Sequence, residues 1–294
     1  MKIKKILSVL LMLFIILLSS CVTGEEIKNI SDSVNHSNGS VNENLIVSII
    51  DVGQGDSILI KTPKGKYVLI DSGSQNEKEK FFKFISRQNI NSFEVVVATH
   101  PHEDHIGNLD EVITNYNVEN IYMPKVTSNT STFRNLMTAI KNKGLKVKNA
   151  FAGVSFDIDG VKFAFLAPNS QKYDELNNYS AVLKVTYKDK SFLLMGDAEK
   201  LSENEILKNA MGLNADVIKV GHHGSSSSSS KAFINAVSPK YAVISCGKNN
   251  DYGHPHRETL KLLSDMKIKT FRTDIDGTII FTTNGNDIKT STIN

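Results

Sequence analysis

The sequence predicts an α/β (α+β) domain in which two stacked β-sheets carry helices on their outer faces. Short apolar runs of strand length alternate with stretches of helical periodicity, and this alternation follows a strand-rich segment twice along the chain. Phe93–Thr99 is a strand of Val and Ala type, as expected in a sheet covered on both faces. With 294 residues and 40% hydrophobic content, the chain has enough apolar material for a sizeable core.

Three strands open the first half of the domain. Leu45–Asp51 and Ser57–Lys61 come first, and the turn Pro63–Lys66 joins the second of them to Tyr67–Asp71 as a hairpin. Helices and strands then alternate as helix Glu77–Gln88, strand Phe93–Thr99, helix Gly107–Tyr116, strand Val118–Met123 and helix Thr132–Lys143.

The second half repeats this plan. Its strand-rich segment contains Val154–Ile158, Val161–Leu166, Ala181–Tyr187 and Ser191–Met195. The strands that follow are Val217–Val220, Ala242–Ser245, Lys267–Arg272 and Thr278–Thr282, with helices near 199–209, 230–237 and 256–266.

Residues 1–20 have the pattern of a secretion signal. Three lysines precede an apolar run over Ile6–Leu18, which is too short to be a comfortable membrane-spanning helix. The run ends in Leu18-Ser19-Ser20-Cys21, which resembles the bacterial lipobox, whose cysteine is lipidated and becomes the mature N-terminus. We expect an exported lipoprotein, anchored through Cys21 with its domain on the outer face of the membrane. The alternative is a plain signal peptide with an incidental cysteine.

Residues 21–44 separate this anchor from the domain. Residues 22–44 are rich in Ser, Asn and Glu and have no apolar period, which is typical of a flexible tether. No other long linker appears, so residues 45–294 are interpreted as one domain.

Cysteine usage argues against an intrachain disulfide, and the charge balance argues against an overall basic surface for nucleic acid. If Cys21 is lipidated, Cys246 has no intrachain disulfide partner, and its place after an apolar run indicates a buried strand end. Without the three lysines of residues 1–20, the mature chain has 31 basic and 31 acidic residues. A nucleic-acid-binding protein usually has a basic footprint, so any such footprint here must be a local patch.

A cluster of metal-binding residue types follows the strand Val95–Ala98. His100 and His102 are one residue apart, so a turn can bring both imidazoles to one metal ion. Asp104 and His105 are adjacent and can reach a second point close by. Imidazole and carboxylate ligands suit Zn²⁺, Mn²⁺ or Fe²⁺, and a loop at the carboxyl end of a strand is where α/β folds place their sites.

The stretch Thr99-His100-Pro101-His102-Glu103-Asp104-His105 resembles the metal-binding signature of the metallo-β-lactamase superfamily. Five further motifs support this resemblance, namely Asp51–Ser57, Ile70–Gly73, Met195–Glu199, Lys219–Ser225 and Tyr252–His256. Together they are similar, from about residue 45 to 285, to the hydrolase domain of the bacterial competence proteins that internalise DNA. This resemblance implies a four-layer αββα sandwich and one or two bound divalent metal ions, Zn or Mn.

The resemblance also implies roles for individual residues. His100 and His102 would bind a first metal, Asp104 and His105 a second, and Asp197 would bridge both. One histidine of the pair His222-His223 would complete the second position, with His223 favoured, while the other contacts substrate phosphate. Asp71 would orient the metal-binding loop through hydrogen bonds rather than bind metal.

One departure makes the two metal positions unequal. Most two-metal members of the superfamily have a histidine just before the strand that leads to the bridging aspartate, but this chain has Asn177-Asn178-Tyr179-Ser180 there. We therefore expect weaker binding at the first position, and Asn178 and Ser180 become candidates for holding a phosphate oxygen.

Further candidates surround the expected mouth of the site. Gln54 and Asp56 are expected to line it, and His254 or Arg257 to reach it and bind phosphate, unless their segment is only a helix-capping loop or a surface loop. The serine run that begins at Ser225 is interpreted as hydroxyls at a phosphate site or, alternatively, as a flexible polar loop.

These observations favour a metal-dependent hydrolase, with a phosphodiesterase, including a nuclease version, as the first hypothesis. Asp104 or Asp197 would orient the attacking water, and His222 or His254 would serve near the leaving group. The expected substrates are phosphodiesters of nucleic acid or of a wall polymer. The alternatives are hydrolysis of a lactam, lactone or thioester, and a non-catalytic, metal-bound surface binding lipoprotein.

Overall fold

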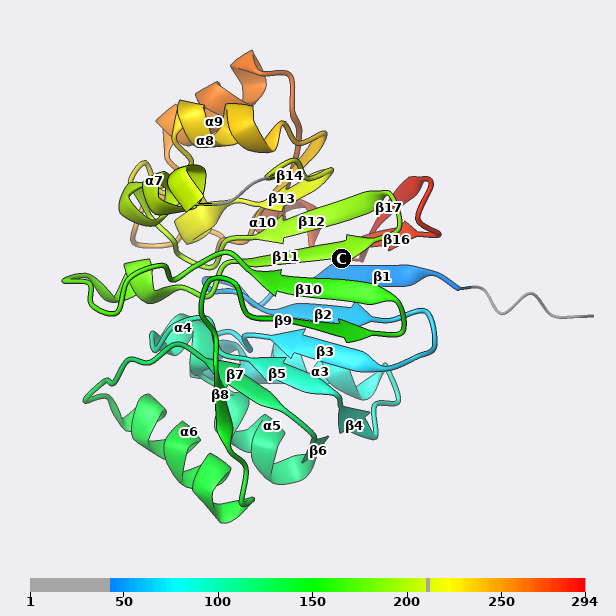
Figure 1. Cartoon of the computed structure of the whole chain (residues 1–294), viewed down its shortest axis with the longest axis vertical. Helices are drawn as coiled ribbons and strands as arrows, with labels where there is room; N and C mark the ends of the chain where they lie inside the picture. Colours follow the sequence, from blue (N-terminus) through cyan, green and yellow to red (C-terminus); the bar gives the residue numbers. More distant parts are fainter. Residues whose placement is uncertain (1–42, 210–211, 294) are drawn as a thin grey trace, which may run out of the picture. The chain divides into compact units, whose positions relative to one another are not determined.

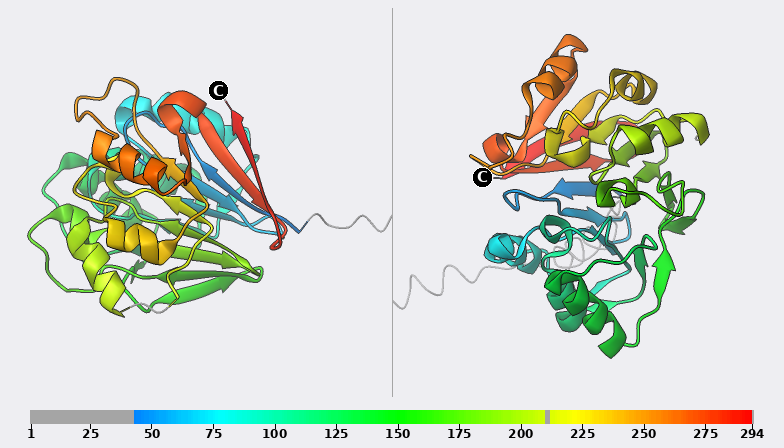
Figure 2. Two further views of the ribbon diagram at one scale, coloured as in Figure 1. Left: turned by 90° about the horizontal axis from the view of Figure 1, so that it is seen from above. Right: turned by 90° about the vertical axis from the view of Figure 1, so that its left-hand side faces the viewer.

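Two large sheets lie against each other in the middle of the domain (Figures 1 and 2). The computed structural model describes residues 43–209 and 212–293, which belong to the compact unit Glu43–Asn294. The expected signal segment, Cys21 and the expected tether up to residue 42 lie outside the described residues. Within the described part, no helix is both long enough and apolar enough to cross a membrane.

The first sheet has eight strands and changes character at its middle. Its order is β17 (Ile288–Ile293), β16 (Thr278–Thr283), β1 (Leu45–Ile49), β2 (Ile58–Lys61), β3 (Tyr67–Ile70), β5 (Val95–Val97), β7 (Ile121–Met123) and β8 (Val147–Asn149). Pairs from β17 to β3 are antiparallel, and pairs from β3 to β8 are parallel. The expected hairpin of β2 and β3 is confirmed.

The second sheet repeats this plan with seven strands. Its order is β15 (Lys269–Arg272), β14 (Tyr241–Ile244), β13 (Val217–Lys219), β12 (Lys190–Leu194), β11 (Leu183–Tyr187), β10 (Val161–Phe165) and β9 (Ser155–Ile158). Pairs from β9 to β12 are antiparallel, and pairs from β12 to β15 are parallel. A separate ribbon pairs β4 (Ser92–Phe93) with β6 (Asn117–Val118).

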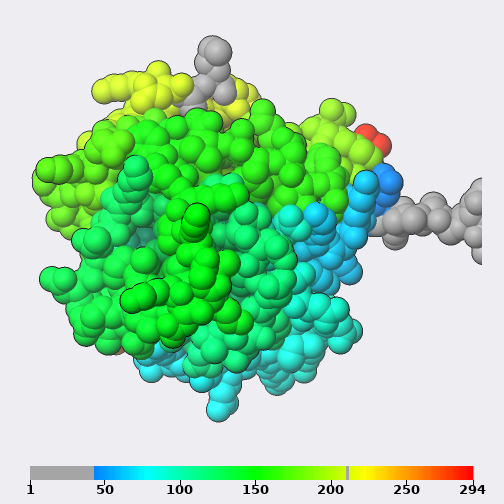
Figure 3. Space-filling model, turned by 60° about the horizontal axis from the view of Figure 1, so that its bottom comes forward, coloured from blue at the N-terminus to red at the C-terminus, as the bar shows by residue number. Residues whose placement is uncertain are grey.

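Helices cover the outer face of each sheet. The first sheet carries α3 (Lys78–Ser86), α4 (Glu103–Ile106), α5 (Leu109–Asn115) and α6 (Ser131–Asn142), whose side of the domain is cyan and green in Figure 3. The second sheet carries α7 (Lys200–Asn209), α8 (Lys231–Val237) and α9 (Arg257–Asp265), and α10 (Thr273–Asp276) joins β15 to β16.

Three apolar cores separate these four layers. One contains side chains from both sheets, such as Val47 and Phe192, and therefore lies between them. Another joins the first sheet to its helices through Phe81 and Leu136, and the last joins the second sheet to its helices through Phe233. Each such large side chain contributes about 1.5–3 kcal/mol by its burial. The expected four-layer sandwich is confirmed.

The sequence prediction needs correction in several places. The expected strand Phe93–Thr99 is divided between β4 and β5, and Val118–Met123 is divided between β6 and β7. The expected helix Gly107–Tyr116 begins only at Leu109, because Gly107 ends α4 and Asn108, whose N donates to Ser72 Oγ at 2.9 Å, leaves the helical conformation. The elements β8, α10 and β17 were not expected, since each is short or has an exposed face with a weak apolar pattern.

Candidate metal centre

The candidate metal-binding side chains and their support Asp71 lie just after the carboxyl ends of β-strands. Asp71 follows β3, the His100–His105 stretch follows β5, Asp197 follows β12, and the pair His222-His223 follows β13. The carboxyl ends of parallel strands meet at one edge of a sheet, so both sheets deliver residues to the same place.

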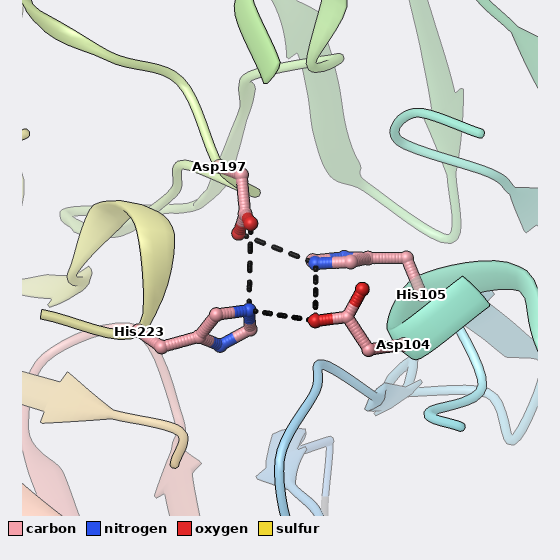
Figure 4. Close-up of side chains that lie close together, drawn as sticks. All are labelled: Asp104, His105, Asp197 and His223. Carbon is pink, nitrogen blue, oxygen red and sulfur yellow. Dashed lines mark ion pairs between the residues drawn. The ribbon is translucent and has the colours of Figure 1, made fainter. Parts of the chain in front are cut away.

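Four side chains form the centre of the site, shown in Figure 4. His105 Nε2 lies 3.3 Å from Asp197 Oδ1 and 3.9 Å from Asp104 Oδ2. His223 Nε2 lies 3.2 Å from Asp104 Oδ2 and 3.4 Å from Asp197 Oδ2. One ligand atom from each of the four residues falls within 4.8 Å of the others, which is a spacing that one metal ion can span.

Unsatisfied atoms in this group fit a metal ion. His105 Nε2, His223 Nε2 and Asp197 Oδ1 are buried, and none of them has a hydrogen-bond partner of acceptable geometry in the described part of the chain. A buried polar atom without a partner costs about 1–3 kcal/mol, so it calls for an explanation. Two imidazole nitrogens and two carboxylates are a donor set that suits Zn²⁺ or Mn²⁺. The chemistry of the group therefore fits the expected second metal position.

The other nitrogen of each imidazole has a fixed partner. His105 Nδ1 lies 2.8 Å from Asp71 Oδ2, and His223 Nδ1 lies 3.0 Å from the Ser245 carbonyl oxygen. Asp71 also accepts hydrogen bonds from Thr99 N at 2.8 Å and Thr99 Oγ1 at 2.6 Å. These contacts orient both rings so that Nε2 faces the group, and Asp71 acts by hydrogen bonding, as the resemblance implied.

Asp104 and His105 lie in a helical turn, where a loop was expected. They belong to α4, and the Asp104 carbonyl oxygen accepts from Asp56 N at 3.1 Å. A side chain at Gly55 would meet that carbonyl oxygen at 2.2 Å, so only glycine lets the two segments approach this closely.

The two neighbouring histidines of the second sheet differ in surroundings. Both adopt left-handed backbone conformations in the 3-10 turn η3 (Gly221–Gly224), with φ of 49° and 52°. His223 is 1% exposed and points into the group of four. His222 is 23% exposed at its side chain, its Nδ1 lies 3.0 Å from Ser227 Oγ, and its Nε2 lies 3.8 Å from Asp197 Oδ2. The structure therefore brings His223, and not the more exposed His222, into the group of four potential ligands.

The first metal position is less complete. His100 Nε2 lies 3.0 Å from His102 Nδ1 and 3.9 Å from Asp197 Oδ2. Neither His100 nor His102 belongs to a group of three or more potential ligands within the described residues. The expected inequality between the two positions therefore appears in the geometry.

Electrostatics keep the carboxylates of the group charged. Burial would raise the pKa of Asp197, but His223 and His105 hold it well below its usual range. Burial would lower the pKa of His105 and of His223, but the neighbouring carboxylates, led by Asp197, raise both well above the usual range. Burial and the neighbouring His105 lower the pKa of His100 well below its usual value. A cation therefore competes with protons at the second position and meets a neutral imidazole at the first.

A buried ion pair lies beneath the group. Asp56 Oδ2 is 2.9 Å from Lys219 Nζ, and Asp56 Oδ1 is 3.5 Å from His223 Nδ1. Asp56 is 2% exposed, so the expectation that it lines the mouth is wrong. Its burial raises its pKa, but Lys219 and His223 overcome that effect and lower it to about 2. Local sequence pattern did not predict the burial of Lys219, since a lysine at the end of an apolar strand usually faces solvent.

A cavity of about 540 Å³ opens over the group. Among the expected residues, its walls include Gln54, His102, Asp104, Asp197, His222, His223 and His254. Residues that the sequence analysis did not single out also line it, namely Ser74, Asn76, Glu103, Thr130, Asn177 and Tyr252. Gln54 lines the cavity, and its Oε1 accepts a hydrogen bond from Gly247 N at 3.1 Å.

Besides Asp56, three more expected substrate contacts do not reach this cavity. Asn178 is 4% exposed and donates to Glu199 Oε2 at 3.3 Å, so Asn177 faces the cavity instead. Ser180 is fully buried, and its Oγ accepts from Asp197 N at 3.0 Å, which makes it a support for Asp197. Arg257 is exposed at the start of α9 and is not part of the wall.

The serine run is the remaining correction. Ser225 is 6% exposed, and Ser228 Oγ donates to the Ala198 carbonyl oxygen at 2.8 Å. Glu203 accepts from the backbone amides of Ser229 and Ser230. The run is therefore an anchored turn, and it neither lines the cavity nor forms the free polar loop of the alternative interpretation.

His254 lies at the cavity wall with a neutral ring. Its centroid is 5.4 Å from that of His222, while His256 turns away and accepts from Ser226 N at 2.9 Å. Burial and the nearby His223 lower the pKa of His254 to about 4. This shift favours the neutral ring at neutral pH, so His254 can serve the cavity wall as a hydrogen-bond partner.

Comparison with known proteins identifies the family. Residues 50–248 match the model of the metallo-beta-lactamase superfamily. The chain belongs to this superfamily, whose members are generally hydrolases and whose fold binds one or two metal ions.

Relatives place it near the competence proteins. The chain is 34% identical to ComE operon protein 3 of Bacillus subtilis over 251 residues, covering 79% of this chain and 32% of that protein. It is 30% identical to Competence protein ComA of Neisseria gonorrhoeae, covering 80% of this chain and 32% of that protein. The chain thus spans about a third of the length of these relatives.

Solved structures support the fold alone. The metallo-beta-lactamase fold protein YhfI of Bacillus subtilis superposes with a TM-score of 0.54 at 10% identity, covering 82% of this chain and 100% of that one. CmlA of Streptomyces venezuelae, described as a diiron beta-hydroxylase, superposes with a TM-score of 0.53 at 13% identity. The match covers 85% of this chain and 54% of that one.

Proposed function

We propose that this protein is a metal-dependent phosphodiesterase held at the outer face of the membrane by a lipidated Cys21. The observation that carries the enzymatic part is the group Asp104, His105, Asp197 and His223 at the base of an open cavity. Asp197, fixed by Ser180, would be the carboxylate shared between two metal positions. Divalent cations held there would lower the pKa of water and neutralise charge that develops on the substrate.

The chain's own residues would divide the remaining work. Asp104 is 30% exposed at its side chain and Asp197 only 3%, so Asp104 is the more accessible carboxylate of the group and can orient an attacking water. Asn177 Nδ2 and His222 Nε2 lie 3.4 Å apart on the wall, where both can donate to a phosphate oxygen. His254 adds a neutral ring to the same wall.

A phosphodiester suits this wall better than a carbonyl substrate. Hydrolysis of a lactam needs a strongly bound first metal to polarise the carbonyl, and within the described residues His100 and His102 belong to no group of three or more potential ligands. The cavity instead offers several donors, which match the non-bridging oxygens of a phosphodiester. The relatives named as competence proteins favour the same class.

The test is turnover by the purified protein loaded with Mn²⁺ or Zn²⁺. Bis-p-nitrophenyl phosphate and single-stranded DNA are the phosphodiester substrates, and nitrocefin is the carbonyl substrate. We expect cleavage of a phosphodiester and none of nitrocefin. Nitrocefin cleavage alone would favour the lactamase type, and a metal-loaded protein inert toward every substrate would favour a binding module.

The membrane anchor has a separate test. Cells that express the full chain should incorporate labelled fatty acid into it, and Cys21→Ser should abolish the label. Labelling that survives this substitution would contradict the anchor.

A further inference from the structure

A second cavity adjoins the one over the metal centre. It has a volume of about 600 Å³ and shares His254 with the first. Its wall includes the segment Gly247–Asn250, Gly253 and the pair Arg272 and Asp274. A substrate that fills only the first cavity would leave this space unused, so the geometry suits a chain that continues past the reacting group.

An exposed aromatic ring lines the first cavity and contacts His254, the residue that both cavities share. Tyr252 lines the first cavity and is 67% exposed, the largest exposed fraction among the large hydrophobic side chains of the described residues. One face of its ring stacks on His254, with centroids 5.6 Å apart and an interplanar angle of 20°. A ring with one face supported and most of its surface in water is a platform for another planar group.

The loop that carries this ring is held in place. Asn250 Nδ2 donates to the carbonyl oxygens of Gly247 at 2.9 Å and His254 at 2.6 Å. Asn250 Oδ1 accepts from Tyr252 N at 3.2 Å and His254 N at 3.0 Å. This clamp orders the platform before any ligand arrives, which reduces the entropy that binding would cost.

The charged side chains at the second cavity are Lys248, Arg272 and Asp274, of which only Lys248 is left without an ion pair among the described residues. Arg272 is committed to Asp274, with Nε–Oδ1 of 3.0 Å and Nη2–Oδ2 of 2.6 Å. Lys248 is exposed and has no ion-pair partner within the described residues. A free ammonium in the wall of the adjoining cavity would repel a choline headgroup but attract a phosphate.

We propose that Tyr252 and Lys248 form an extended subsite for single-stranded nucleic acid, in which Tyr252 stacks on the base next to the reacting phosphate and Lys248 binds the following phosphate. The subsite deepens the proposed phosphodiesterase function and rests on it for its catalytic consequence. It also reconciles a neutral mature chain with a polyanionic substrate, because stacking supplies affinity that a basic groove would otherwise provide.

Binding can be measured without turnover, because the chain contains no tryptophan. Tyr252→Trp introduces a single reporter into the platform, and Leu201→Trp, on α7 at 52% exposure, is the matched control. The probes are a ten-residue oligothymidylate, an abasic oligomer with the same phosphates, and phosphocholine, mixed rapidly so that binding is recorded before cleavage.

We expect oligothymidylate to quench the Tyr252→Trp reporter and to bind about tenfold more tightly than the abasic oligomer, which is the scale of one stacked base. The control reporter should not respond. Lys248→Ala should reduce the slope of log affinity against log salt concentration by about 0.7, the value for one phosphate contact on a single strand. Equal binding of the abasic oligomer, a response to phosphocholine alone, or no response would overturn the subsite.

Kinetics supply the second readout. In Tyr252→Ala, the ratio of kcat/KM for oligothymidylate to kcat/KM for bis-p-nitrophenyl phosphate should fall about tenfold through KM, and Tyr252→Phe should restore it. An unchanged ratio would contradict the subsite. A protein that binds oligothymidylate through the platform but cleaves neither substrate would instead contradict the phosphodiesterase, so the two failures are distinguishable.

Discussion

The two metal positions share one sequence signature but have different surroundings in the folded protein. At the second position, His105 and His223 each have one nitrogen fixed by a buried acceptor and the other left unsatisfied toward Asp104 and Asp197. At the first, the facing nitrogens of His100 and His102 bond to each other, and within the described residues neither joins a group of three or more potential ligands. Histidines of the signature are present at both positions. Only at the second do hydrogen bonds to Asp71 and to the Ser245 carbonyl oxygen orient the imidazoles for a metal ion.

Removing one histidine from the second position should have the largest effect. His223→Ala should lose about one equivalent of metal and lower kcat by roughly a thousandfold, the upper range for loss of one preorganised charge-stabilising contact. Elemental analysis and bis-p-nitrophenyl phosphate turnover measure both changes.

His222→Ala is the matched comparison for that experiment. It removes the adjacent, more exposed ring, so it should retain metal and raise KM. Metal loss in His222→Ala with retention in His223→Ala would reverse the assignment of the two histidines.

Breaking the buried ion pair between Asp56 and Lys219 should have the next largest effect, on the free energy of unfolding. Lys219→Met leaves Asp56 buried without its cation and should lower the free energy of unfolding by about 3–5 kcal/mol. Lys219→Met combined with Asp56→Asn should recover much of this loss, as urea unfolding at a fixed metal concentration can show. A double variant as unstable as the sum of the two single variants would argue against direct coupling.

The same pair predicts an acid-sensitive component of stability. The folded pKa of Asp56, about 2, lies below its ordinary value of 3.8. Its contribution is therefore complete above about pH 4 and is lost as pH falls toward about 2. In Asp56→Asn, this part of the pH dependence of unfolding should disappear.

Loss of the buried support for His105 should have a smaller effect. Asp71→Ala should weaken metal binding or activity by about 10- to 100-fold, because Asp71 holds the ring without touching the cavity. Asp157→Ala, an exposed carboxylate on β9, is the control and should change neither. Equal effects of the two substitutions on metal affinity would contradict the positioning role.

Adding an imidazole to the first position should have the smallest effect and should narrow the difference between the two positions. Asn177→His places a ring on the cavity wall and should raise the affinity for a second equivalent of metal by about tenfold. Asn178→His is the control, because its buried site should accept the larger ring only with a loss of stability. Metal titration followed by calorimetry distinguishes the two variants.

Local sequence signals predicted most of the elements that build the site. The apolar runs at β5, β12 and β13 were expected, and so were the residue types that follow them. The signals failed where packing overrides local pattern. Asp104 and His105 wind into α4 rather than a loop, and the serine run is fixed by Glu203, which lies 26 residues from Ser229 in sequence.

The sequence by itself determined the family, the two-sheet architecture and the ligand types, because apolar periodicity and the order of histidines and aspartates are local properties of the chain. Only the tertiary structure decided which of His222 and His223 faces Asp197, that Asn177 rather than Asn178 lines the cavity, and that Asp56 is buried against Lys219. These choices depend on backbone conformation and on partners from other elements of the fold. For the two histidines and the two asparagines, adjacent residues of the same type are separated only by the direction in which the fold points their side chains.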